Sequence, residues 1–171
     1  MLLKTLTIVH VLISLIAIGA GFVVLYLAIN RRFCRKWNSW FFINTILTTL
    51  TGFLFPITKF TPALGTGIVS TLLLIPAAYA LYAKKLTPPW TRIYMGLAMA
   101  AFWLNFFVLI VQAFLKIPFL HQFAPNGNEP PFAITQLIGL LAFAILGTLA
   151  TKRANDPQKG VPASAGMTSA S

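Results

Sequence analysis

The sequence predicts an all-α membrane protein, a polytopic bundle of five transmembrane helices with the N-terminus outside and the C-terminus in the cytoplasm. Of its 171 residues, 58% are hydrophobic and only 9% are charged, and the mean hydropathy is +0.83. A soluble domain carries roughly 25% charged residues. The apolar residues also fall in long blocks, and crossing a bilayer core takes about 20 helical residues. Because lipid offers the backbone no hydrogen-bond partner, these blocks are expected to be helices. The five blocks are residues 5–29, 40–58, 64–83, 93–115 and 132–151.

The first block is expected to be a retained span and not a secretion signal. Its apolar run is longer than the 7–15 residues or so of a signal sequence. It ends in the letters NRRFCRKW, which offer no small-residue cleavage site.

The basic residues set the predicted orientation. The net charge of +11 would suggest nucleic-acid binding if it lay on one folded surface. Ten of the 13 Lys and Arg instead follow the first, third and fifth blocks. The other three are Lys4, Lys59 and Lys116. The positive-inside rule places the richer side in the cytoplasm, so the charge is interpreted as a topology signal and no nucleic-acid partner is expected.

Short connections join the blocks into one domain, residues 1–153, as expected for antiparallel neighbours in a bundle. The long external segment is the loop 116–131, which holds His121 and Glu129. Its PNG turn and its Pro130–Pro131 pair are typical of a connector that ends in a helix start. We interpret the loop as a hinge, with a lid as the alternative. The Pro- and Gly-rich residues 154–171 are predicted to be a disordered cytoplasmic tail.

Polar side chains from four spans are predicted to lie in one layer near the outer face. Counting 1.5 Å per residue places four residues at similar depth below the outer surface, with a fifth, Asn105, near mid-bilayer. The four are His10, Thr51, Gln112 and Gln136. In the first interpretation these groups hydrogen-bond one another and hold the helices in register. In the second they form a small site open to the outside, since intramembrane ionisable groups are candidate functional sites.

The candidate cofactor-binding residues are His10 and His121, which both lie on the outer side in this topology. Imidazole is a common axial ligand of haem iron, so haem or quinone is the cofactor alternative. The default expectation is no cofactor. No metal site is expected, because two histidines without nearby cysteine are a poor ligand set. No catalytic residue is assigned, because no carboxylate lies in any block to form a general acid/base pair.

Three segments carry a resemblance to a known group of proteins. They are TTLTGFLFP, FVLIVQAFLKIPFL and PNGNEPPFAITQ. In these segments the chain resembles a set of small bacterial inner-membrane proteins without an assigned activity. The resemblance covers most of the membrane region, stops before the tail, and implies location in the bacterial cytoplasmic membrane.

The functional expectation is a non-enzymatic integral membrane protein, a subunit or accessory factor that meets lipid and either a protein partner or further copies of itself. One alternative is a redox protein with haem or quinone near the outer face. The other is a small-solute channel or transporter acting as a homo-oligomer.

Overall fold

The computed structural model describes residues 2–56 and 62–154, and this part of the chain is helical, without strands. Four of its helical segments are long and apolar enough to cross a membrane: Leu3–Ile29, Leu64–Ala83, Trp90–Lys116 and Pro130–Arg153. The all-α prediction is therefore confirmed, together with four helices of membrane-spanning length and composition. A π-helical segment, Tyr79–Ala83, continues α3. The α-helices in order are α1 (Leu2–Ile29), α2 (Arg35–Phe53), α3 (Pro62–Ala78), α4 (Trp90–Lys116), α5 (Pro118–His121) and α6 (Pro130–Arg153).

The helix that carries most of the predicted second span has bounds that differ from those of the span. The span was expected over residues 40–58, but α2 runs from Arg35 to Phe53. The chain reverses quickly after α1, through Arg31 with a left-handed φ of 57°, so the basic residues that follow already form the first turn of α2. At the other end Pro56 disfavours helix for the residue before it. The remaining residues of the expected span, 57 and 58, lie outside the described part. Its polar first turn, together with its later Asn and Thr residues, leaves α2 outside the group of four apolar helices.

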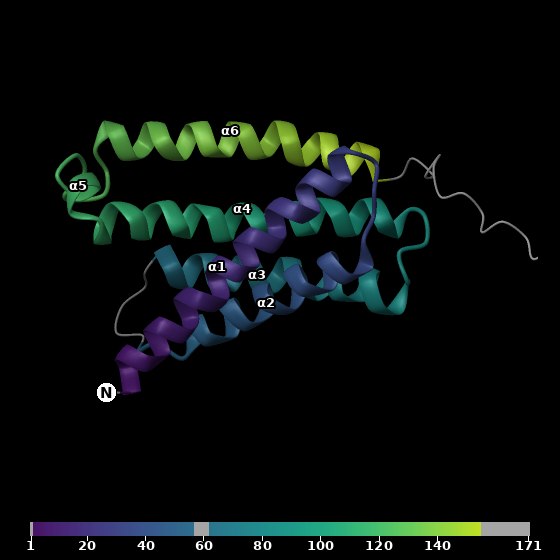
Figure 1. Ribbon diagram of the computed structural model, residues 1–171, viewed down its shortest axis with the longest axis horizontal. Helices are drawn as coiled ribbons and strands as arrows, with labels where there is room; N and C mark the ends of the chain where they lie inside the picture. Colours follow the sequence, from purple (N-terminus) through teal and green to yellow (C-terminus); the bar gives the residue numbers. More distant parts are fainter. Residues whose placement is uncertain (1, 57–61, 155–171) are drawn as a thin grey trace, which may run out of the picture.

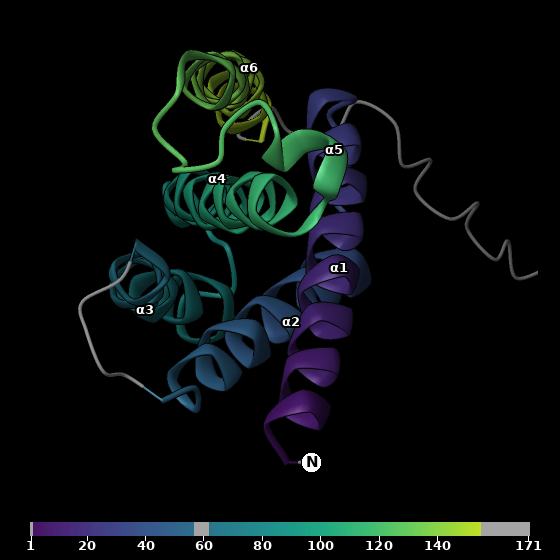
Figure 2. The ribbon, with the colours of Figure 1, turned by 90° about the vertical axis from the view of Figure 1, so that its left-hand side faces the viewer.

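The long helices run back and forth along the longest axis of the molecule (Figure 1). In both views α4 lies between α6 and α3, while α1 crosses them at an angle and pairs with α2 (Figures 1 and 2). The turn α1–α2, the turn from the π-helical segment into α4 and the C-terminus of α6 therefore share one end, the right-hand end in Figure 1.

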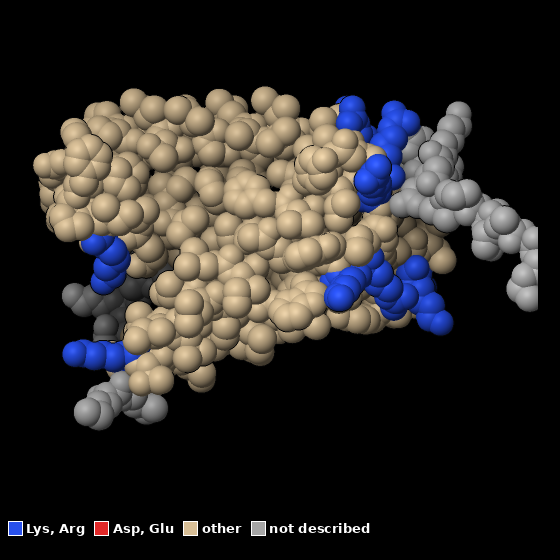
Figure 3. Space-filling view, viewed as in Figure 1, with Lys and Arg blue, Asp and Glu red and all other residues tan. Residues whose placement is uncertain are grey.

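Basic residues gather at that same end, and the middle of the visible surface carries no charge (Figure 3). Two basic residues occupy the opposite end: Lys4 at the start of α1 and Lys116 at the end of α4. Lys59 and Lys159 lie outside the described residues, as does the predicted tail from residue 155 onward. We call the richer end the basic end. Its described members are Arg31, Arg32, Arg35, Lys36, Lys84, Lys85, Arg92, Lys152 and Arg153.

The core lies between α1, α2, α4 and α3 with its π-helical continuation, in the half of the bundle nearer the basic end. Its centre is Phe102 of α4, which is fully buried. Ring centroids lie 5.0 Å away at Phe22, 5.9 Å away at Phe41 and 4.8 Å away at Phe143, all with steeply inclined planes. These edge-to-face contacts are the favourable geometry for aromatic rings. One side chain thus joins α1, α2, α4 and α6.

A hydrogen bond closes the bundle at the basic end. Arg153, in the last turn of α6, donates from Nη1 to the carbonyl oxygen of Ile29, the last residue of α1. The last carbonyls of a helix have no partner within the helix, so this guanidinium satisfies one of them and fixes the two helix ends together.

Candidate functional site

His10 is half-buried on α1 and is bonded to the facing helix. Its Nδ1 lies 2.8 Å from Oγ1 of Thr51 on α2. The same hydroxyl lies 2.7 Å from the carbonyl oxygen of Leu47 and 3.1 Å from that of Thr48, both within its own helix. When the hydroxyl donates its proton to one of these carbonyls, its oxygen can accept a hydrogen bond from Nδ1–H of His10.

Aromatic and small residues hold this imidazole in place. The ring of Phe55, just beyond the end of α2, meets it edge-on at 5.3 Å and 84°. Gly52 lies against its other side, where an added Cβ would be 3.6 Å from Cε1. The His10–Thr51 pair lies toward the end of the bundle opposite the basic end, because it joins the first third of α1 to the last turn of α2.

Asn105 forms a second connection, deeper in the bundle and on another pair of helices. It is buried on α4, and its Nδ2 donates over 3.4 Å to Oγ1 of Thr45 on α2. The Thr45 hydroxyl in turn donates to the carbonyl oxygen of Phe41, 2.8 Å away. The amide bond is long, so it is a weak link between α2 and α4.

Gln136 forms a third connection, between α6 and α4. Its Nε2 donates to the backbone carbonyl oxygen of Phe107 over 3.2 Å. Its Oε1 is buried and has no hydrogen-bond partner among the described residues. Gln112, at nearly the same depth, is exposed on α4.

The predicted polar layer therefore becomes three separate connections, α1–α2, α2–α4 and α4–α6. Of its five residues, the structure joins His10 and Thr51 directly, gives Asn105 and Gln136 other partners, and leaves Gln112 on the surface. Each connection fixes one pair of helices. Chemically, the side chains of His10, Asn105 and Gln136 form hydrogen bonds between helices.

The two histidines lie on elements that do not contact each other. His121 is exposed in α5, and α5 packs on α4 and not on α1. Both views place α5 away from the N-terminal turns of α1 (Figures 1 and 2). Within residues 2–56 and 62–154, no three His, Cys, Asp or Glu side chains come together in a way that could hold a metal ion.

The loop 116–131 folds back onto α4. Ala124 is fully buried and packs in a small cluster with Ile110 and Phe114 of α4. Phe132, at the start of α6, meets Phe114 at 5.5 Å. These contacts hold the middle of the loop and the residue just after its end against α4.

Glu129 orders the turn that precedes α6. Its carboxylate accepts bonds from the backbone N–H of Asn126 at 3.0 Å, from the Asn126 side chain at 2.8 Å and from the backbone N–H of Asn128 at 3.1 Å. Led by the Asn126 backbone bond, these donors lower the pKa of Glu129 from 4.5 to about 2. The negative charge also suits its place at the N-terminus of α6.

Replacing Glu129 by glutamine is expected to loosen this turn in a pH-dependent way. The depressed pKa makes the stabilisation fully present above pH 4.5 and progressively lost as pH falls towards 2. The melting temperature of the purified protein should be lower for Glu129→Gln than for wild type at pH 6, and the gap should close with acidification. A gap that does not change between pH 6 and pH 3 would contradict the assigned bonds.

The His10–Thr51 bond is expected to contribute about 0.6–2 kcal/mol to the stability of the bundle, as other hydrogen bonds between membrane helices do. A double-mutant cycle with His10→Ala and Thr51→Val measures it as the coupling free energy of unfolding in detergent. Ser14→Ala is the control partner for Thr51→Val, because Ser14 bonds within its own helix, to Val11. Equal coupling for both pairs would show that the histidine bond contributes nothing specific.

A groove between α4 and α6 was missed at the sequence level. It is lined by small residues one turn apart, Gly96 and Ala100 on α4 and Ala144 and Thr148 on α6, and it opens near Arg92. Small residues at this spacing indicate close helix packing. The sequence signal for the groove was therefore a row of small residues on each of the two helices, together with basic residues at the same end of both.

Comparison with protein-family models, with curated proteins and with solved structures gives no match for this chain.

Proposed function

We propose that this chain is a five-span protein of the bacterial cytoplasmic membrane, with its N-terminus outside and its basic end in the cytoplasm, and that it acts as a non-enzymatic subunit or accessory factor. The uneven charge of the two ends supports the orientation. The course of α2, antiparallel to α1 along its length (Figure 1), supports counting it as a fifth span despite its polar first turn. Its buried Asn38, Asn44, Thr45 and Thr49 face the bundle and not lipid.

The observation that carries the subunit proposal is the low burial of α6. Only 11% of the residues in its most apolar stretch are buried, against 28–39% in the other three candidate spans. Its outward side chains include Ile138, Leu141 and Ile145, which are 54–67% exposed. A span with so few buried residues has most of its surface free for another transmembrane helix, from a partner protein or from a second copy.

The hydrogen bonds inside the bundle support a structural use of its polar groups. His10, Asn105 and Gln136 each bond to a neighbouring helix, and they do not converge on one cavity. Such bonds hold helices in register.

A photo-crosslinking residue at position 145 tests the subunit proposal in native membranes. We expect Ile145 to give a discrete protein adduct. The matched control is Ile75 on α3, which is 64% exposed and should give lipid adducts alone. Equal patterns at both positions would contradict a partner on α6.

An absorption spectrum of the protein purified in mild detergent tests the non-enzymatic proposal against the redox alternative. The proposal predicts absorption by Trp and Tyr alone. A Soret band, or a quinone signature, that disappears in His10→Ala would replace it with cofactor binding at that imidazole.

A further inference from the structure

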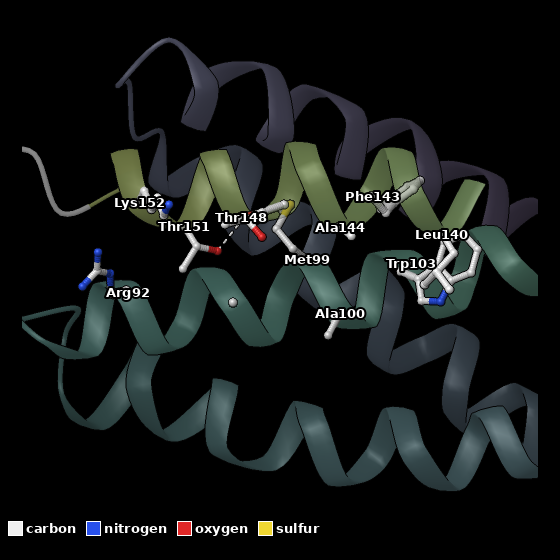
Figure 4. A pocket seen from close by; sticks show the side chains of 12 residues that line it. Arg92, Met99, Ala100, Trp103, Leu140, Phe143, Ala144, Thr148, Thr151 and Lys152 are labelled. Atoms are coloured by element: carbon white, nitrogen blue, oxygen red, sulfur yellow. Dashed lines mark hydrogen bonds between the residues drawn. The ribbon is translucent and has the colours of Figure 1, made fainter. Parts of the chain in front are cut away.

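The groove between α4 and α6 has a volume of about 480 Å³. This lies within the range of roughly 300–1,000 Å³ typical of ligand pockets. It starts at the basic end and runs along both helices towards mid-bundle (Figure 4).

The mouth of the groove is cationic. Arg92, in the first turn of α4, and Lys152, in the last turn of α6, lie on its two sides and are both exposed (Figure 4). No described carboxylate neutralises them, because the one acidic residue in the described part is Glu129, at the opposite end of α6. Thr148 and Thr151 line the groove just inside this mouth (Figure 4).

The inner part of the groove is apolar. Trp103, Leu140 and Phe143 form its inner end (Figure 4). The small side chains of Ala100 and Ala144 leave space along its length. The groove thus has a charged entrance at the level of the basic end and an apolar interior about two to three helical turns deeper.

We propose that this groove binds an anionic glycerophospholipid of the leaflet at the basic end. The phosphate lies between Arg92 and Lys152, and one acyl chain extends past Ala144 to Trp103 and Phe143. Basic pockets between membrane helices on the cytoplasmic side are suited to anionic head groups. A zwitterionic lipid is less suited, because its head group carries a positive charge that Arg92 and Lys152 would repel. This inference rests on the membrane insertion of the bundle, and it is independent of whether α6 also binds a partner.

Native mass spectrometry of the protein in nanodiscs tests the charge requirement. The nanodiscs contain equal amounts of phosphatidylglycerol and phosphatidylcholine with identical acyl chains. Wild type should retain phosphatidylglycerol preferentially. In Arg92→Gln/Lys152→Gln this preference should fall about tenfold or more, since each basic residue near an anionic surface contributes roughly fivefold.

A matched double variant separates the groove from the general charge of the basic end. Lys36→Gln/Lys85→Gln removes the same net charge from exposed residues of the same end that do not line the groove. It should keep the preference for phosphatidylglycerol. An equal loss in both double variants would overturn the proposal and assign the effect to the overall electrostatic field.

A steric pair of variants tests occupation by the acyl chain. Ala144→Trp fills the groove and should abolish retention of the lipid, whereas Ala142→Trp, on the exposed surface of α6 outside the groove, should leave it unchanged. The proposal is also overturned if wild type retains the two lipids equally, or if a photo-crosslinker at position 144 reports a protein helix in the groove.

Discussion

Replacing Phe102 by alanine is expected to lower the free energy of unfolding by about 3–5 kcal/mol, the usual cost of truncating a buried phenylalanine. The ring is fully buried, and it meets Phe22, Phe41 and Phe143 from three other helices. No single neighbour can fill the space it leaves, because each of the three is fixed on a different helix. The measurement is equilibrium unfolding of the purified protein in mixed micelles with increasing denaturing detergent.

The control for this variant is Phe119→Ala on α5. Phe119 is 66% exposed, and its described ring contact is with Phe123 in the same loop. The same truncation there should cost well under half as much. Similar losses for the two variants would show that Phe102 is not the centre of the core.

Gly21→Leu is expected to separate α1 from α4. A Cβ at Gly21 would lie 2.6 Å from two ring carbons of Phe102, closer than real Cβ contacts come. The ring is confined on its other sides, so the helix must shift. Overpacking of this kind costs typically 1–3 kcal/mol and sometimes more.

Gly19 provides a matched control on the same helix. Nothing lies within 4 Å of a Cβ built there, so Gly19→Leu should leave stability nearly unchanged. The combined variant Gly21→Leu/Phe102→Ala should lose less stability than the sum of the two single variants, since the added leucine side chain occupies space that Phe102→Ala opens. Strict additivity would argue against the close approach of the two helices.

The sequence was sufficient to predict the helices that carry long apolar runs, because lipid forces such runs into helix whatever their neighbours are. It was less informative for α2. Arg35 and Lys36 were assigned to the loop as charged residues, yet they form the first turn of α2, which starts directly after the reversal at Arg31. A charge at the membrane surface does not end a helix, since its long side chain reaches water from the first turn.

The hydrogen bonds between helices show a second limit of prediction from the sequence. The depth of His10, Thr51 and Gln136 can be counted at 1.5 Å per residue, so their similar level was predictable. Which side chains meet depends also on the rotation of each helix and on the angle at which α1 crosses its neighbours (Figure 2). Periodicity within one helix does not determine either quantity. The His10–Thr51 pair was one of several combinations allowed at that depth, and the exposure of Gln112 was not evident from the sequence.

The groove between α4 and α6 could not be predicted from the sequence for a similar reason. Gly147 approaches Met99 closely, with a built Cβ 3.3 Å from the Met99 Cβ, while Ala100 and Ala144 leave the space beside this contact open. Small residues alone indicate only that helices can approach. Whether the approach is closed or leaves a groove is decided by the large side chains around it, here Trp103 and Phe143.

The membrane topology is the central claim, and cysteine accessibility in intact bacterial cells tests it most directly. In a Cys34→Ser background, Lys59→Cys probes the connection after α2 and Lys85→Cys the connection after the π-helical segment. The five-span arrangement predicts that a membrane-impermeant maleimide labels Lys59→Cys in intact cells, and labels Lys85→Cys only after the membrane is permeabilised. Labelling of both positions from the same side would contradict α2 and α3 as oppositely directed neighbours that end on different sides of the membrane.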